Sequence, residues 1–190
     1  MKWARHSDLT GKHALLGASK FHWINYSEEK LVNWYKLSLA KERGVILHDF
    51  ASRCLYLRQR LPKRKKTLNM FVNDSIEFDM KSEQILWYSD NCFGTADAIG
   101  FDGKTLRISD LKTGSTPAHM EQLYIYAALF CLEYDVDPRS VYIQLRIYQN
   151  NEVTISEEPN EIVEQIMNKI EVFDSIIDNI KQEGFYGEPA

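Results

Sequence analysis

An Asp102-Gly103 pair lies between two runs of apolar and β-branched residues, at 92–101 and 104–112. Asp-Gly in such a setting is the strongest short-range signal for a β-hairpin, and the loop that it favours has two residues. The middle of the chain is therefore expected to form an antiparallel pair of strands, against which the remaining elements pack.

The register of this hairpin follows from the two-residue loop. Phe101 then pairs with Lys104, and counting outward places Asp97 opposite Ile108. Directly opposed residues share a face of the sheet, and so do residues two apart along one strand. Asp97 and Asp110 are therefore expected to point to the same side.

Two carboxylates and a lysine meet on this face, because Lys112 is two residues beyond Asp110. Diagonal neighbours of this kind lie roughly 7–8 Å apart, a gap that two carboxylates can span by binding one Mg²⁺-type cation. A solvated salt bridge between Asp110 and Lys112 is the simpler alternative. Leu106 and Ile108 share the face and favour at least partial burial, and buried charges seldom lack a partner or a metal.

Hydrophobic periodicity predicts an α/β fold. Helical patterns cover 28–40, 44–60, 118–134 and 162–180, with Ser27 as a candidate N-cap of the first. The pattern at 66–79 is ambiguous, and a short helix is one interpretation of it. Strand patterns cover 85–89, 92–101, 104–112, 141–149 and 153–156. The order is αβββαβ with extra flanking helices, which predicts a sandwich around a mixed central sheet. The passage from 104 to 149 is long enough for a right-handed crossover.

Length and composition fit one folded domain. A chain of 190 residues can bury a sizeable core, and 44% hydrophobic residues is typical of a globular protein. No shift in composition marks a boundary, so we expect a single domain over 1–190 with its core at about 28–182. We find no apolar run near the length of a membrane span and no signal-peptide pattern, so we expect a soluble, cytoplasmic protein without a membrane partner.

The chain has three cysteines, Cys54, Cys92 and Cys131, which are isolated from one another. Their odd number and their spacing argue against a disulfide framework and against a zinc site. We expect reduced thiols that pack in the interior.

Net charge is −4, which by itself argues against binding to nucleic acid. One stretch departs from this balance, with six cations within nine residues and no acid among them. We call it the basic segment: Arg58, Arg60, Lys63, Arg64, Lys65 and Lys66. It is either a solvated helix end, since Pro62 would stop a helix there, or a rim that binds DNA phosphates beside an acidic site.

Asp97 followed by Asp110-Leu111-Lys112 resembles the active-site signature of the PD-(D/E)XK nuclease superfamily. Gly44-Val45-Ile46-Leu47-His48 is similar to the G-x-x-x-H motif, and Gln122-Leu123-Tyr124-Ile125-Tyr126 to the Q-x-x-x-Y motif, of its branch of RecB-type nuclease domains and phage recombination exonucleases. The motifs stand in the family order over residues 44–126. Ala96 replaces the proline of the family name, and Asp110 takes its Asp option, so no ligand is lost.

The resemblance implies a restriction-endonuclease-like sandwich that binds one or two Mg²⁺ or Mn²⁺ ions. The implied metal ligands are Asp97, Asp110, the backbone carbonyl of Leu111, and His48 as a ligand or a neighbour of one. The implied catalytic residues are Asp97, Asp110, Lys112, Gln122 and Tyr126. Some relatives carry an iron-sulfur cluster on four cysteines, and three cysteines make that cluster unexpected here.

The function implied is hydrolysis of DNA phosphodiester bonds, foremost as an exonuclease on DNA ends in phage or mobile-element recombination or repair. Two alternatives stay open: a nicking or structure-specific endonuclease or nuclease module of a larger complex, and a non-catalytic nucleic-acid-binding subunit of the same fold. DNA is the expected partner. A single-strand annealing protein, a helicase or further copies of the chain are the other partners that the resemblance leaves open.

Overall fold

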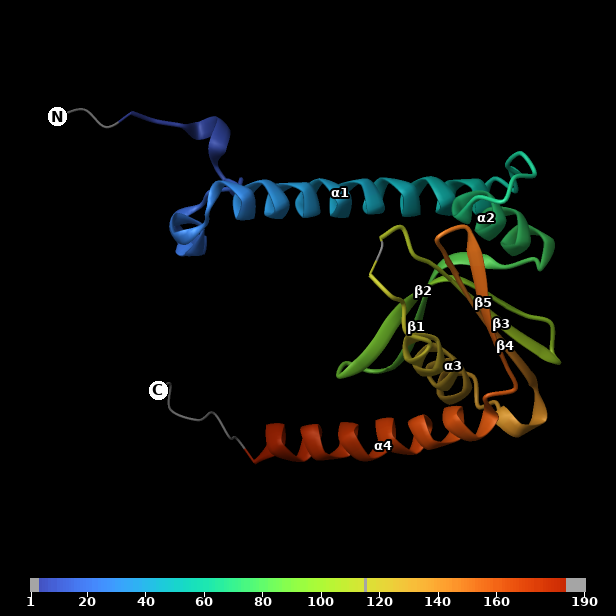
Figure 1. Ribbon diagram of the computed structural model, residues 1–190. Coiled ribbons are helices and arrows are strands. Elements are labelled where there is room, and N and C mark those ends of the chain that lie inside the picture. Colours follow the sequence, from blue (N-terminus) through green and yellow to red (C-terminus); the bar gives the residue numbers. More distant parts are fainter. Residues whose placement is uncertain (1–3, 115, 184–190) are drawn as a thin grey trace. The chain divides into compact units, whose positions relative to one another are not determined.

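Helix α1 (Glu28–Tyr56) is continuous over its whole length (Figure 1). The computed structural model describes residues 4–114 and 116–183, and contacts within them form two compact units that divide between Glu42 and Arg43. The prediction of two separate helices, at 28–40 and 44–60, is wrong. The intervening residues are all good helix formers: Lys41, Glu42 and Arg43. A single glycine such as Gly44 destabilises a helix by only about 1 kcal/mol.

The first unit contains two short 3-10 helices, η1 (Ser7–Leu9) and η2 (Ala18–Asn25), and the beginning of α1. Ser27 is the N-cap of α1 as predicted, because its Oγ accepts a hydrogen bond from the backbone N of Lys30 over 3.2 Å. Trp23 donates from Nε1 to the carbonyl of Gly17 over 3.0 Å and so closes η2 on itself.

The second unit is built on a five-stranded sheet in the order β1-β2-β3-β4-β5. Its strands are β1 (Lys81–Ser89), β2 (Cys92–Phe101), β3 (Thr105–Leu111), β4 (Tyr142–Gln149) and β5 (Glu152–Glu157). Only β3 and β4 pair in parallel, and α3 (Glu121–Glu133) and η3 (Pro138–Ser140) lie in the connection between them. The predicted α/β fold with a mixed sheet is confirmed.

Helices cover both faces of this sheet (Figure 1). One face carries a core made with α3 and α4 (Asn160–Gln182), which includes Leu106, Ile108, Leu123 and Val163. The other face packs on the end of α1 and on α2 (Thr67–Glu77), with a core that includes Leu55, Phe71, Leu111 and Tyr148. The ambiguous stretch 66–79 is therefore helical. Its apolar residues Phe71, Val72 and Ile76 are buried.

The central hairpin forms, but its predicted register is wrong by two residues. Phe101 pairs with Leu106 rather than Lys104, and Ile99 pairs with Ile108. Asp102 explains the wider loop, because its Oδ1 accepts hydrogen bonds from the backbone N of Lys104 (3.0 Å) and of Thr105 (2.8 Å). A shift of two residues preserves the face of every side chain, so the predicted facing of Asp110 survives the change.

Helix α1 ends at Tyr56, four residues before the predicted end at Arg60. Arg58 adopts the left-handed conformation, with φ of +54°. The backbone N of Gln59 bonds to the carbonyl of Cys54 and that of Arg58 to Leu55, the hydrogen bonds of a Schellman motif. Within 4–114 and 116–183, no helix is both long and apolar enough to cross a bilayer.

Candidate active site

The ladder between β1 and β2 is irregular at Glu83 and Asp97. Ala96 belongs to the core on the α3 side and Ala98 to the core on the α1 and α2 side, although residues two apart in a regular strand share a face. Glu83 has a φ of +51° within β1, between Ser82, which pairs with Ala98, and Gln84, which pairs with Ala96. Such distortions of a strand re-aim side chains and are frequent beside active sites.

Asp97 joins three elements at this point. Its Oδ2 accepts a hydrogen bond from the backbone N of Leu111 at the end of β3, over 2.8 Å. The same oxygen lies 3.4 Å from Nδ1 of His48 on α1. The hydrogen bond to Asp97 raises the pKa of the His48 imidazole above its usual value, and burial acts in the opposite direction.

Asp110 lies buried beside a lysine. Its side chain is 4% exposed, and Lys112 Nζ is 3.0 Å from each of its carboxylate oxygens. The lysine forms its hydrogen bond with Oδ1, while Oδ2 is buried and receives no directed hydrogen bond. Burial, followed by the charge of Asp97, raises the pKa of the Asp110 carboxyl.

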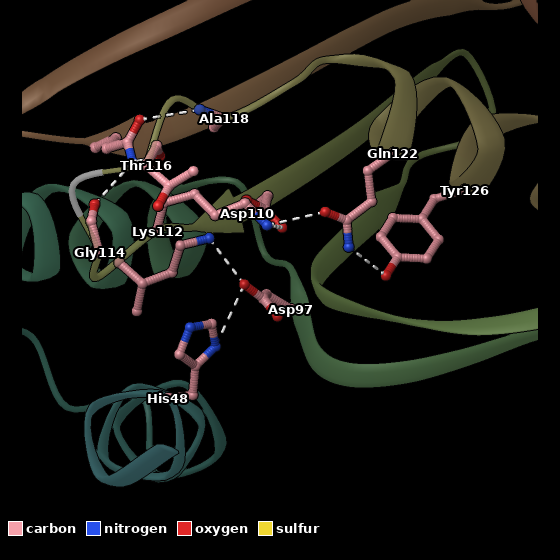
Figure 2. Close-up of polar contacts among 11 residues, drawn as sticks. His48, Asp97, Asp110, Lys112, Gly114, Thr116, Ala118, Gln122 and Tyr126 are labelled. Atoms are coloured by element: carbon pink, nitrogen blue, oxygen red, sulfur yellow. Dashed lines mark hydrogen bonds and ion pairs between the residues drawn. The ribbon is translucent and has the colours of Figure 1, made fainter. Parts of the chain in front are cut away.

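A polar chain continues from Lys112 onto α3 (Figure 2). Lys112 Nζ donates to Oε1 of Gln122 over 2.9 Å, and Gln122 Nε2 donates to the hydroxyl of Tyr126 over 2.9 Å. Gln122 and Tyr126 are one helical turn apart, so they share a face of α3. Burial raises the pKa of the Tyr126 hydroxyl.

Gly44 brings α1 close to the chain that follows β3. A Cβ atom at this position would lie 2.9 Å from Oγ1 of Thr113, so only glycine fits without displacement of a neighbour. His48 is one turn further along the same helix, and the close approach at Gly44 therefore sets how near His48 comes to Asp97.

The structure thus brings the sequence-predicted side chains His48, Asp97, Asp110, Lys112, Gln122 and Tyr126 into one connected region. Leu111 takes part through its backbone N, which is bonded to Asp97. A cation would fit the donor set: the chemistry is that of carboxylate oxygens with one imidazole, and the buried Asp110 Oδ2, which is 3.0 Å from Lys112 Nζ, receives no directed hydrogen bond.

Glu83 is a site residue that sequence reasoning missed. Among the described residues, one group of potential metal ligands has donor atoms all within 4.8 Å of one another: His48, Glu83 and Asp97. Asp110 is not part of this group, so the predicted set of His48, Asp97 and Asp110 does not form one tight cluster. The predicted strand began at Ile85, which left Glu83 outside the sheet.

The basic segment divides into two parts. Arg58 is ion-paired with Asp79, and Arg60 Nη1 lies 3.6 Å from Oε2 of Glu77. The segment itself contains no acid, but the turn between α1 and α2 brings acids from the end of α2 beside these two residues. The other four are exposed and have no ion-pair partner within the part of the chain that the structure describes: Lys63, Arg64, Lys65 and Lys66.

Searches of family models, of curated proteins and of solved structures gave no match to this chain. The functional argument therefore rests on the site itself.

Proposed function

We propose that this protein is a divalent-metal-dependent deoxyribonuclease of the PD-(D/E)XK type. The observation that carries the proposal is the buried Asp110 carboxylate, on a side chain that is 4% exposed, which contacts Lys112 and has one oxygen without a directed hydrogen bond. A buried carboxylate of this kind is costly unless a cation completes its surroundings. Lys112 supplies one positive charge, and the nearby Asp97 adds a negative one that Lys112 alone does not balance.

The residues that would hold Mg²⁺ or Mn²⁺ are Asp97 and Asp110, with His48 and the Leu111 carbonyl as the further donors of the motif. A cation bound there supplies Lewis-acid chemistry, which acidifies water and stabilises negative charge on phosphoryl and leaving oxygens. The remaining work falls to groups of the chain itself.

Lys112 would place its ammonium beside the scissile phosphate and the attacking water. In the free protein this group is bound by Asp110 and Gln122, over 3.0 and 2.9 Å, so its position is fixed before substrate arrives. Such preorganisation lowers the cost of stabilising the charge that develops in the transition state. Hydrolysis adds the oxygen of water to phosphorus and breaks the bond to one sugar oxygen, which leaves with a proton.

Gln122 and Tyr126 would hold the DNA backbone on the α3 side of the site. The Gln122 amide has a second hydrogen beyond the one that it donates to Tyr126, and the Tyr126 hydroxyl can donate to a phosphate oxygen. Contacts to phosphate position a nucleic acid without reading its sequence. We therefore propose little sequence specificity.

The activity that we favour is that of an exonuclease on DNA ends, of the RecB-type and phage recombination branch. The exposed Lys63–Lys66 stretch supports a DNA substrate, because an acidic site needs cations nearby to hold a polyanion.

The test is incubation of the full chain with linear, nicked and closed circular duplex DNA, with Mn²⁺, with Mg²⁺ or with chelator. We expect metal-dependent release of mononucleotides from linear DNA only. Release of longer fragments, or cleavage of circular DNA, would instead identify an endonuclease. No cleavage together with DNA binding would identify a non-catalytic subunit.

Variants of the site make this test specific. Asp110→Asn and Asp97→Asn should each abolish cleavage, and Lys112→Gln should abolish it while metal binding remains. Glu152→Gln is the matched control, because it neutralises an exposed carboxylate on β5, a strand that contributes no residue to the proposed site. Cleavage at the wild-type rate in Asp110→Asn would refute the proposed active site.

A further inference from the structure

Helix α4 carries a second apolar face beside the one that packs on its own core. Val163 and Ile170 are its buried residues, in the core that α4 forms with α3 and the sheet (Figure 1). The second face lies roughly a quarter of a turn further around the helix. Its large apolar side chains are between 43% and 56% exposed: Ile162, Phe173, Ile176 and Ile180. A contiguous row of such side chains in water marks an interaction surface.

This face has the spacing of a coiled-coil seam. We call it the α4 seam, and its residues follow one another by steps of three and four: Ile166, Lys169, Phe173, Ile176, Ile180 and Glu183. Two helices whose contact residues alternate in this way fit the side chains of one between those of the other. From Ile166 to Glu183 the seam is about 26 Å long at 1.5 Å per residue. It is therefore shaped to receive another helix.

A groove beside the α4 seam adds depth to this surface. It lies between α3 and α4, has a volume of about 350 Å³, and its walls include Ile125, Phe173 and Ile177. Ile125 and Ile177 are each 40% exposed. A side chain of an incoming helix can therefore enter between α3 and α4, as a knob enters a hole.

The charges of α4 argue against a membrane or a nucleic acid as the partner. Acids outnumber lysines along the helix, with Glu161, Glu164, Glu171, Asp174 and Asp178 against Lys169 and Lys181. Helices that lie on membranes carry mainly lysine and arginine on their polar face, and DNA phosphates also require cations. The partner is therefore expected to be a protein.

The order of charges along the α4 seam matches a second copy of the same seam. Lys169 lies near the start of the seam and Glu183 at its end. If two copies of α4 run antiparallel, with Phe173 of each against Ile176 of the other, Lys169 lies one helical turn from Glu183 of the second copy. Two-fold symmetry makes this pair of opposite charges twice. A parallel pairing would instead set Lys169 against Lys169.

We propose that two copies of this chain pair through the α4 seam, with the two helices antiparallel. The inference goes beyond the proposed nuclease function and does not depend on it, because α4 contributes no residue to the proposed active site. A single pair of helices is small for a specific protein interface. We therefore expect a dimer that dissociates on dilution.

The experiment is sedimentation velocity of the full chain over a range of concentrations. We expect a concentration-dependent change from monomer to dimer in the wild type. Ile176→Asp should raise the dissociation constant at least about tenfold, because it buries an unpaired charge in the apolar contact. Ile155→Asp is the matched control: Ile155 on β5 is 46% exposed and Ile176 is 48% exposed, so the same change off the seam should leave the dimer intact.

A charge exchange tests the antiparallel arrangement. Lys169→Glu should weaken the dimer about three- to tenfold, because two attractive pairs become repulsive. The double variant Lys169→Glu/Glu183→Lys should restore the wild-type dissociation constant, and melting temperature is the control for folding. A wild type that stays monomeric, or a folded Ile176→Asp protein that dimerises as the wild type does, would overturn the inference. A double variant no better than Lys169→Glu alone would overturn the antiparallel pairing.

Discussion

Gly94 and Tyr126 are in direct contact: a Cβ atom on Gly94 would lie 2.8 Å from Cε1 of the tyrosine ring. The bare backbone of β2 therefore allows the ring to lie close to the strand, where its hydroxyl accepts a hydrogen bond from Gln122 over 2.9 Å. Gln122 in turn binds Lys112. The small residue on β2 thus permits the whole chain of hydrogen bonds from α3 to the end of β3.

Gly94→Ala should disturb this chain of contacts. The added methyl group would push the Tyr126 ring away, and such overpacking costs typically about 1–3 kcal/mol. We expect a lower free energy of unfolding, measured in urea, and a clear loss of cleavage with Mn²⁺. Gly114→Ala is the control, because no atom of the other described residues lies within 4 Å of a Cβ atom there.

Combining Gly94→Ala with Tyr126→Ala identifies the cause. If the ring is what the methyl group meets, the two substitutions together should cost less than the sum of their separate effects. Strict additivity would show that Gly94 matters for another reason.

Divalent metal should stabilise the folded protein. A ligand that binds only the native state adds RT ln(1 + [L]/Kd), which is about 1.4 kcal/mol at a tenfold excess over Kd. Asp97→Asn should remove this gain, because Asp97 is one of the two carboxylates proposed to hold the ion. The measurement is the midpoint of thermal unfolding with and without Mn²⁺. A Mn²⁺-induced shift that survives in the double variant Asp97→Asn/Asp110→Asn would mean that the ion binds elsewhere.

Asp110→Asn should raise the melting temperature of the protein in chelator. Burial and the charge of Asp97 raise the pKa of Asp110, so its ionised form at neutral pH is less favourable in the folded protein than in the unfolded chain. The amide removes that penalty and can still accept a hydrogen bond from Lys112. A lower melting temperature would show that the ion pair with Lys112 outweighs the cost of burial.

Much of the site could be predicted from the sequence because strand parity is robust. The predicted hairpin register was wrong by two residues, yet Asp110 and Lys112 still face α3, where Lys112 meets Gln122. A turn signal fixes the existence of a hairpin better than its loop length, which here depends on the hydrogen bonds that Asp102 accepts.

Glu83 could not be predicted in the same way. It lies in the polar run 81–84, which lacks the apolar alternation of a strand, and its position depends on a left-handed φ within β1. The partners of Arg58 and Arg60 were equally hidden, since Asp79 and Glu77 reach them only through the turn between α1 and α2. Long-range pairings of this kind carry no local signal.

Asp102 should make the stability of the central hairpin depend on pH. Hydrogen bonds from the backbone of Thr105 and then of Lys104 lower the pKa of its carboxyl. A lowered folded pKa means that the stabilisation is complete above the unfolded value of about 3.9 and is lost as pH falls through the folded pKa.

Urea unfolding of the wild type and of Asp102→Ala, from about pH 3 to about pH 7, checks this prediction. This range includes the ordinary pKa of Asp, about 3.9. We expect the wild type to be more stable at neutral pH, and the difference to shrink below about pH 4. Asp90→Ala, in the turn between β1 and β2, is the control and should give a smaller difference. A difference that stays constant down to the lowest pH would show that the charge of Asp102 plays no part.

The basic segment should bind DNA through its unpaired residues only. Each phosphate contact releases counterions, so log K falls with log of the salt concentration by about 0.9 per phosphate neutralised on duplex DNA. Lys63, Lys65 and Lys66 have no ion-pair partner among residues 4–114 and 116–183, so their replacement by Gln should flatten this slope by up to about 3 units. Binding is measured with Ca²⁺ in place of Mg²⁺ to keep the DNA intact.

Arg58→Gln/Arg60→Gln is the matched comparison, because these two cations are already neutralised by Asp79 and Glu77. This variant should leave the salt slope nearly unchanged, and it should lower stability instead, because it breaks the contacts between the end of α1 and the end of α2. Affinity of the triple lysine variant should fall alike on all sequences, since phosphate contacts do not read bases. Equal slopes for the triple variant and the wild type would show that the lysines are only a solvated loop, and that DNA reaches the site from another side.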